Sequence, residues 1–264
     1  PNKSWARVPE LQFRDPGFFV FRHRAFMCRD DDRIMGTSRV GAAEFRAGDE
    51  VVVPSFGGER AAELVRGAGA EPVFADIDAA SFCLDPTAAE AAISSRTTAV
   101  FPVALFGQSP DMAGLLQLAG RRGVQLIDPG VVDDAAVRMA GSARRRQIAQ
   151  YLNTRLTGVV TPPVRPGRAH LFTRYVVRVP GNGRPDRDAF RRALRARGIV
   201  AEVPVPTPAH RTAAFRQARL LPETERAAAE SLALPVHEGM TRREVHRFVS
   251  ACNALGGLVL EPAC

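Results

Sequence analysis

The chain has 264 residues, of which 45% are hydrophobic and 24% charged, as is ordinary for a globular protein that buries a sizeable core. No window approaches 18 apolar residues, and the N-terminal PNKSWARVPELQ lacks an apolar signal region, so we expect neither a membrane span nor a secretory leader. The four cysteines (Cys28, Cys83, Cys252, Cys264) have no disulfide or metal spacing, which predicts reduced thiols in a cytoplasmic protein and no metal site.

The net charge is +8 and the sequence pI is about 10.4. A basic chain can bind nucleic acid, but here the arginines are spread out and the one strong run, Arg144-Arg145-Arg146, has no aromatic residues interleaved. We therefore do not expect nucleic acid as the partner. An anionic small substrate, such as a nucleotide sugar, or an acidic partner suits the charge as well.

Residues 1–48 have no clear period, so their pattern predicts no helices or strands there. From residue 49, strand-like and helix-like segments alternate, which predicts βαβ units and a parallel sheet. In chain order the segments are VVVP (51–54), ERAAELVRGAGA (59–70), EPVFADID (71–78), a helix opened by Asp85-Pro86, TTAVFPVALFG (97–107), a helix capped by Asp111 and ended by Gly123, and VQLID (124–128). Ligands bind beyond the carboxyl ends of such strands, which here present Ser55, Asp76, Phe106-Gly107 and Asp128.

The alternation of strands and helices changes after Asp134, and we divide the chain into a large domain at 1–141 and a small C-terminal α/β domain at 142–264. The segments expected in the second domain are helices at 142–156 and 186–198, strands at 172–180 and 199–205, and a helix followed by a strand at 225–235. Thr241 and Glu244 form a capping box that opens a last helix, with Val245, Phe248 and Cys252 facing inward.

Several of these segments, taken in order, resemble the DegT-type nucleotide-sugar aminotransferases, which are pyridoxal-phosphate (PLP) enzymes of fold type I. The resemblance covers most of 47–134 and 144–255, and its clearest parts are AGDEVVVPSF (47–56), AVFPVALFGQSPDM (99–112), GRRGVQLID (120–128), RGIVAEVPVPTPAHRTAAF (197–215) and LPETERAAAESLALPVHEGM (221–240). It implies transamination of a keto sugar attached to a nucleotide. It also implies a lysine that holds PLP as a Schiff base, an aspartate paired with the pyridine nitrogen, and a phosphate-binding turn at a helix N-terminus.

The lysine is missing. In the family it lies well downstream of the pyridine-binding aspartate, whereas only about ten residues separate Asp134 from the basic helix here, a span typical of a plain connecting loop. None of them is lysine, and every basic residue of the chain except Lys3 is arginine. A guanidinium cannot form a Schiff base. We therefore expect an α/β chain with an incomplete large domain of PLP fold type I, truncated in the segment that carries the catalytic base, followed by the small C-terminal domain.

The remaining cofactor-binding candidates are alternatives or partial matches. Aligned through VVDDAAV, Asp134 takes the pyridine position. Aligned through GRRGVQLID, Asp128 falls one place early, so both stay candidates. The phosphate turn is matched by Gly36-Thr37-Ser38, although the helix expected after it is short.

Other positions of the family pattern are altered. Ser55 belongs to the Pro-Ser-Phe segment of the cofactor site, but Gly58 stands where the family has a ring that stacks on the pyridine. Ala104 and Pro204 replace family histidines, whereas His210 matches the second histidine of its stretch and is the candidate for substrate contact.

Two functions follow from this pattern. In the first, the chain is a degenerate, non-catalytic homologue that binds a full-length aminotransferase paralogue or a sugar-processing enzyme, forms homo- or hetero-oligomers and uses no cofactor. In the second, it binds PLP or pyridoxamine phosphate (PMP) and a partner chain supplies the base. A nucleic-acid binder and a decayed gene fragment are the remaining alternatives, and we favour the first function.

Overall fold

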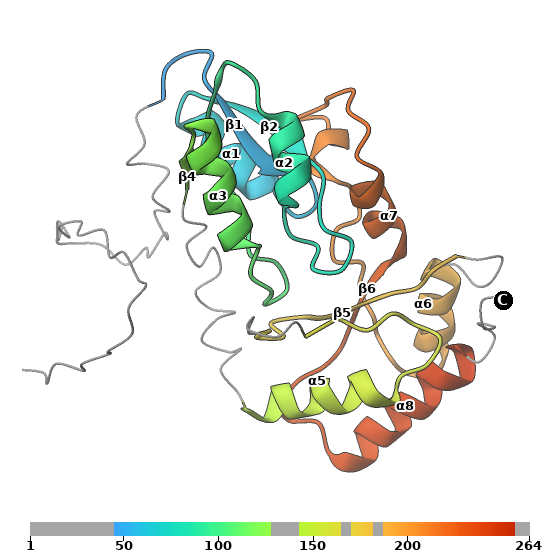
Figure 1. Cartoon of the computed structure of the whole chain (residues 1–264). Helices are drawn as coiled ribbons and strands as arrows, with labels where there is room; N and C mark the ends of the chain where they lie inside the picture. The colour runs from blue at the N-terminus through green and yellow to red at the C-terminus, as the bar shows by residue number, and fades with distance from the viewer. Residues whose placement is uncertain (1–44, 128–142, 165–169, 182–186, 257–264) are drawn as a thin grey trace, which may run out of the picture. The chain divides into compact units, whose positions relative to one another are not determined.

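The computed structural model describes residues 45–127, 143–164, 170–181 and 187–256. Its elements, shown in Figure 1, include a four-stranded parallel sheet in the order β2-β1-β3-β4 and a two-stranded antiparallel sheet of β5 and β6. The strands are β1 (Glu50–Pro54), β2 (Glu71–Ala75), β3 (Thr97–Val100), β4 (Gln125–Leu126), β5 (Tyr175–Arg178) and β6 (Ser231–Leu234). The α-helices are α1 (Glu59–Gly67), α2 (Pro86–Ala92), α3 (Met112–Arg122), α5 (Ala143–Arg155), α6 (Arg187–Ala196), α7 (Pro222–Glu230) and α8 (Arg242–Gly256).

Strand β1 lies inside the larger sheet, and its three valines are fully buried because both faces are covered. Val51 and Val53 point to one face and pack with α1 residues and with the segment 209–221. Val52 points to the opposite face, where α2 and α3 lie on the viewer's side of the sheet in Figure 1. The continuous apolar run at 51–53 thus forms a doubly covered strand, as the sequence predicts.

Local capping signals set the ends of several helices. Asp85 accepts the backbone N–H of Ala88 at 2.8 Å and starts α2, and Asp111 accepts that of Gly114 at 3.1 Å and starts α3. The backbone φ of Gly123 is +65°, a left-handed conformation that ends α3 at no steric cost. The capping box of α8 is confirmed, since Thr241 N–H donates to Glu244 at 2.8 Å and Glu244 N–H donates back at 3.3 Å.

Two predicted strands are shorter than the sequence suggested. The run at 97–107 forms strand only as far as Val100, because Pro102 has no N–H with which to continue the ladder. The segment 199–205 forms only an isolated bridge between Glu202 and Ala233, and Pro204 removes the next donor in the same way.

The second half of the chain contributes to both sheets. The core around β5 and β6 consists of side chains from α5, α6 and α8, including Leu152, Phe190 and Phe248. By contrast, Ala209, Phe215 and Leu221 pack into the core of the larger sheet. The chain therefore crosses back after 205, so the part we assigned to a separate small domain also covers one face of the large one. None of the helices in the described ranges is both long and apolar enough to span a bilayer.

Candidate functional site

The candidate site is the strand-tip region, which we define as the residues that directly follow β1, β2 and β3. Ser55 follows β1, and its Oγ lies 2.6 Å from Nδ1 of His210. The same Oγ accepts the backbone N–H of His210 at 3.1 Å, and the carbonyl of Ser55 accepts the N–H of Ala209 at 2.9 Å. The structure thus brings together two residues predicted for different roles, Ser55 for the cofactor and His210 for the substrate.

Both ring nitrogens of His210 have partners, and the residue is fully buried. Burial lowers the pKa of His210, and the hydrogen bond that the ring donates to Glu225 only partly opposes this, so the imidazole is mainly neutral at pH 7. A neutral ring has one N–H; the hydrogen-bond pattern assigns it to Nε2, which donates to Glu225 Oε1 at 3.4 Å. Nδ1 then accepts the Ser55 hydroxyl proton. A ligand that used either group would have to displace these bonds.

Asp76, directly after β2, caps a helix that is far away in the sequence. Its carboxylate accepts the backbone N–H of Thr224 at 2.7 Å and of Glu223 at 3.0 Å, in the first turn of α7. It also accepts the N–H of Ile77 at 3.0 Å. The two donors from α7 hold that helix against the sheet, and the negative charge of Asp76 lies at the positive end of the helix dipole.

The free edge of β2 is covered by side chains from the same returning segment. Gln217 donates to the carbonyl of Pro72 at 2.7 Å, and Arg219 donates to the carbonyl of Phe74 at 2.7 Å. These are alternate carbonyls of an edge strand, the groups that would otherwise be available to pair with another strand.

Three phenylalanines fill the space beyond the strand tips. Phe56 stacks on Phe82 with ring centroids 5.5 Å apart, and Phe106 meets both rings edge-on. Gly107 has φ +91°, and a Cβ there would lie 2.6 Å from the backbone nitrogen of Phe172. Only glycine permits this approach, which brings the loop after β3 against the segment before β5.

Arg178 of β5 ties the two sheets together. Its guanidinium donates to the carbonyl of Ala79 at 2.6 Å and to Glu230 at 3.1 Å, and it lies 5.5 Å from the centre of the Phe82 ring. With only about a tenth of its side chain exposed, this arginine fixes β5 to the loop after β2.

One cavity of about 450 Å³ lies next to the strand-tip region, and we call it the strand-tip cavity. Its lining includes Ser55, Gly57, Glu59, Arg60, Pro204, Thr207 and Thr212. The volume lies in the range of small-molecule sites. Of the two predicted site residues that the structure describes, Ser55 lines this cavity, whereas His210 bonds to Ser55 and does not line it. Asp128, Asp134, Gly36, Thr37 and Ser38 lie outside the described residues.

The described residues do not fit a covalently held pyridoxal group. The only lysine of the chain is Lys3, which lies outside them. At Gly58, the position of the family's stacking ring, a Cβ would lie 1.8 Å from the carbonyl oxygen of Pro54, so this backbone admits no side chain there. The Ser55 hydroxyl is engaged by His210.

Glu225, Gln217 and Arg219 were not predicted in this region, and Asp76 was predicted at a strand end but not as the cap of a helix. One feature of the sequence could have indicated that α7 is capped by a distant residue. Helix α7 begins at Leu221-Pro222 with no side-chain cap of its own, so its free N–H groups required an acceptor from elsewhere in the chain.

Comparison with known proteins gives a consistent family assignment. A model of the DegT/DnrJ/EryC1/StrS aminotransferase family matches residues 38–137 and 138–253. The two matched segments meet close to the junction at which the sequence predicts a missing piece. A "Pleiotropic regulatory protein" of Geobacillus stearothermophilus is 28% identical over 286 positions, covering 74% of this chain and 75% of the relative. That aligned stretch is longer than this chain, so it contains residues with no counterpart here.

Local similarity to sugar aminotransferases is higher but shorter. A UDP-2-acetamido-2-deoxy-3-oxo-D-glucuronate aminotransferase of Pseudomonas aeruginosa is 39% identical over 100 residues, which cover 38% of this chain and only 26% of the enzyme. A crystal structure of DesV from S. venezuelae, in complex with a ketimine intermediate, superposes with a TM-score of 0.69 at 22% identity and covers 83% of this chain and 81% of that one. The fold is therefore α/β, of PLP fold type I.

Proposed function

We propose that this chain, which belongs to the DegT/DnrJ/EryC1/StrS aminotransferase family, binds and supports a partner enzyme instead of transferring amino groups itself. The observation that carries the proposal is the absence of any lysine other than Lys3. No described residue of the strand-tip region has a primary amine, so this region itself offers neither a covalent anchor for PLP nor the base that the family's chemistry needs.

The geometry of the strand-tip region supports this proposal. In a working site, polar groups are held ready for a ligand. Here the Ser55 hydroxyl, both nitrogens of His210 and the carboxylate of Asp76 are all engaged by groups of the same chain. Their hydrogen bonds stabilise the fold, and using them for a ligand would cost that stability.

The partner we propose is a full-length aminotransferase paralogue or a sugar-processing enzyme of nucleotide-sugar or secondary-metabolite biosynthesis. Several relatives are named as aminotransferases of UDP-linked sugars or of scyllo-inosose compounds, which supports that setting. A large domain that lacks a segment leaves apolar surface and strand edges to be covered, and a whole subunit could cover them.

Co-purification tests the proposal directly. The tagged full chain would be expressed with and without an untagged full-length family member from the same source. We expect a complex of fixed stoichiometry in the first case and self-association or poor stability in the second. A clean, stable monomer that recovers no partner would contradict the proposal.

A second candidate function rests on the strand-tip cavity of about 450 Å³ beside Ser55. In this alternative the chain holds PLP or PMP without a covalent bond, and the partner chain supplies the base. Saturable binding of PMP to the isolated chain, together with amino transfer that appears only when both chains are mixed, would favour it. The matched control is the mixture with the partner's own catalytic lysine replaced.

A further inference from the structure

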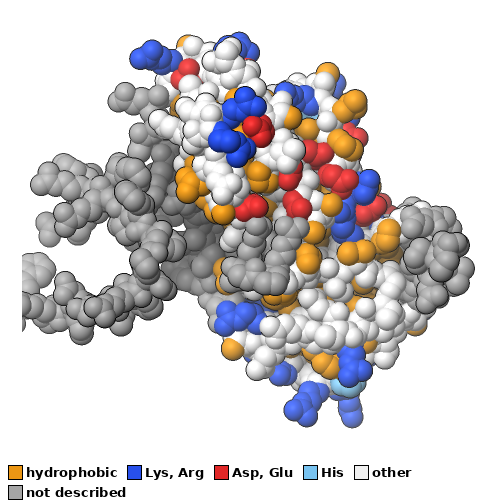
Figure 2. Space-filling view, viewed as in Figure 1, with side chains coloured by type: hydrophobic (Ala, Val, Ile, Leu, Met, Phe, Trp, Pro, Cys, Tyr) orange, Lys and Arg blue, Asp and Glu red, His pale blue; other side chains and the backbone are white. Residues whose placement is uncertain are grey.

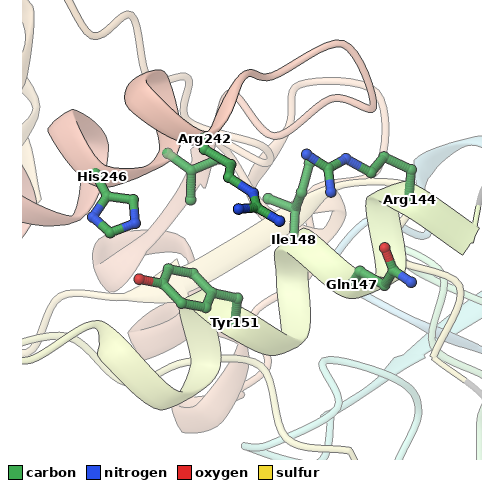
Figure 3. Close-up of a pocket in the computed structure, with 7 residues that line it drawn as sticks. Arg144, Gln147, Ile148, Tyr151, Arg242 and His246 are labelled. Carbon is green, nitrogen blue, oxygen red and sulfur yellow. The ribbon is translucent and has the colours of Figure 1, made fainter.

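A second cavity, of about 360 Å³, lies between α5 and α8, away from the strand tips. We call it the α5–α8 pocket. Figure 3 shows the side chains that line it: Arg144, Gln147, Ile148 and Tyr151 from α5, and Arg242 and His246 from α8. Arg144 belongs to the one basic run of the sequence, which the proposed function leaves without a role.

The guanidinium groups of Arg144 and Arg242 both extend toward the middle of this pocket (Figure 3). Within the described ranges neither forms an ion pair, and the contact found for Arg144 is a long one, 3.5 Å to the carbonyl of Met240. Glu244, the acidic residue in the first turn of α8, accepts from Thr241 instead. Two like charges that share a pocket repel each other, and an anion placed between them removes that cost.

The position of these arginines in their helices strengthens the argument. Arg144 lies in the first turn of α5 and Arg242 in the first turn of α8, the ends where the helix dipole disfavours cations. On the face shown in Figure 2, basic side chains appear over α5 and α8 without acidic ones beside them, whereas both kinds mix over the larger sheet. The charged side chains visible over these two helices on this face are therefore basic.

The other wall of the pocket is aromatic and apolar. The rings of Tyr151 and His246 lie 5.9 Å apart at 39°, and the buried side chains of Ile148 and Val245 are next to them. Arg155 lies 5.6 Å from the centre of the Tyr151 ring and helps to hold it in place. Such a wall suits a planar group, which stacks on aromatic rings.

From this combination we propose that the α5–α8 pocket binds an organic phosphate with a planar second part, such as a nucleotide. The phosphate lies between Arg144 and Arg242, where guanidinium groups can each donate two hydrogen bonds, and the planar part lies against Tyr151 and His246. This site is separate from the strand-tip region and does not depend on the proposed function.

Calorimetric titration of the full chain with uridine diphosphate, pyrophosphate and uridine tests the site. We expect one molecule of uridine diphosphate per chain, bound more tightly than either fragment and more weakly as salt is raised. Arg144→Gln and Arg242→Gln should each weaken binding about tenfold, as the loss of a charge-assisted pair does. Tyr151→Leu should weaken uridine diphosphate several-fold and leave pyrophosphate unchanged.

Matched controls are Arg146→Gln, in the same basic run, and Arg243→Gln, next to Arg242; neither residue lines the pocket. Both variants should bind within about twofold of the unaltered chain if the effect is local rather than a matter of net charge. Equal weakening in the controls, no saturable binding, or pyrophosphate bound as tightly as uridine diphosphate would overturn the proposal. Binding of only an oligonucleotide or an acidic peptide would overturn it as well.

Discussion

The strand-tip region and the α5–α8 pocket both contain polar side chains, but these are bonded within the chain in the first and open to a ligand in the second. At the strand tips, Ser55, His210 and Asp76 bond to one another or to backbone groups of the returning segment. In the α5–α8 pocket, Arg144 and Arg242 face each other without an acidic partner among the described residues. The family's reaction belongs to the first region, yet the groups free to take a ligand lie in the second. A strand tip can thus keep the residue types of a reactive site while using them for structure.

The difference has an energetic basis. A buried polar group that lacks a hydrogen bond costs about 1–3 kcal/mol, so a buried region emptied of its ligand must find internal partners or lose stability. An exposed arginine pays no such cost because water solvates it. The buried polar groups of the strand-tip region therefore need hydrogen-bond partners from the same chain, whereas the exposed arginines of the α5–α8 pocket do not.

The largest expected effect is on acid stability, because the closed interior holds neutral histidines. Burial lowers the pKa of His170 to about 4, and that of His210 is lowered as well. Protonation therefore favours the unfolded chain, in which the pKa is 6.5, so stability is complete above pH 6.5 and falls as the pH drops toward 4. For His170 the loss is roughly 3 kcal/mol at the lower end.

Urea unfolding at pH 7.5 and at pH 4.5 would measure this loss, and a His170→Gln variant should show a smaller difference between the two. His170 accepts the N–H of Phe172 at 3.0 Å and stacks on its ring, so the variant will also be less stable at pH 7.5. An identical difference in both proteins would rule out His170 as the source.

The next largest loss of stability is expected from removing the hydroxyl of Ser55 in the strand-tip region. Ser55→Ala leaves Nδ1 and the backbone N–H of His210 without their partner in a fully buried place, which should cost about 1–3 kcal/mol in unfolding free energy. Ser250→Ala, at an exposed position of α8, is the matched control and should change little. If Ser55→Ala lowered the unfolding free energy no more than Ser250→Ala does, then water or a ligand, and not Ser55, would be the hydrogen-bond partner that matters to His210.

Replacing Asp76 tests whether a strand tip holds α7 in place. Asp76→Ala removes a cap that accepts from Thr224 and Glu223, and we expect a loss of about 1–2 kcal/mol. Hydrogen exchange should then rise in the first turn of α7 more than in α1. Unchanged exchange at Thr224 would show that the helix does not depend on this carboxylate.

The smallest effects should come from the open pocket. Arg144→Gln and Arg242→Gln should change the unfolding free energy by less than about 0.5 kcal/mol, as is usual for exposed positions away from packed contacts. Thermal unfolding of both variants and of Ser55→Ala would compare their losses of stability. A loss as large as that of Ser55→Ala would mean that these arginines serve the fold rather than a ligand.

The sequence predicted the features that depend on neighbours along the chain. The apolar run of β1, the caps at Asp85 and Asp111, and the Thr241–Glu244 box each involve residues within a few positions, and each is confirmed. The predicted strand at 97–107 ends at Val100 in the structure, because Pro102 has no N–H to continue the ladder although the composition favours a strand.

The contacts of the strand-tip region could not be predicted from local sequence patterns, because they join residues that are far apart along the chain. Ser55 and His210 are 155 residues apart along the chain, and Asp76 and Thr224 are 148 apart. The family resemblance placed Ser55 and His210 in two different roles, but only the packing of segment 209–221 on the larger sheet shows that they meet. Likewise, the run Arg144-Arg145-Arg146 gave no sign that Arg242 would lie opposite it.

The most direct test of the central claim is a search for a covalent pyridoxal adduct. The purified chain would be incubated with PLP, reduced with borohydride and measured by intact mass, next to a Lys3→Arg variant. We predict that neither protein carries a stoichiometric pyridoxyl group and that neither moves an amino group to a keto sugar. One pyridoxyl group per chain, accompanied by turnover, would contradict the account.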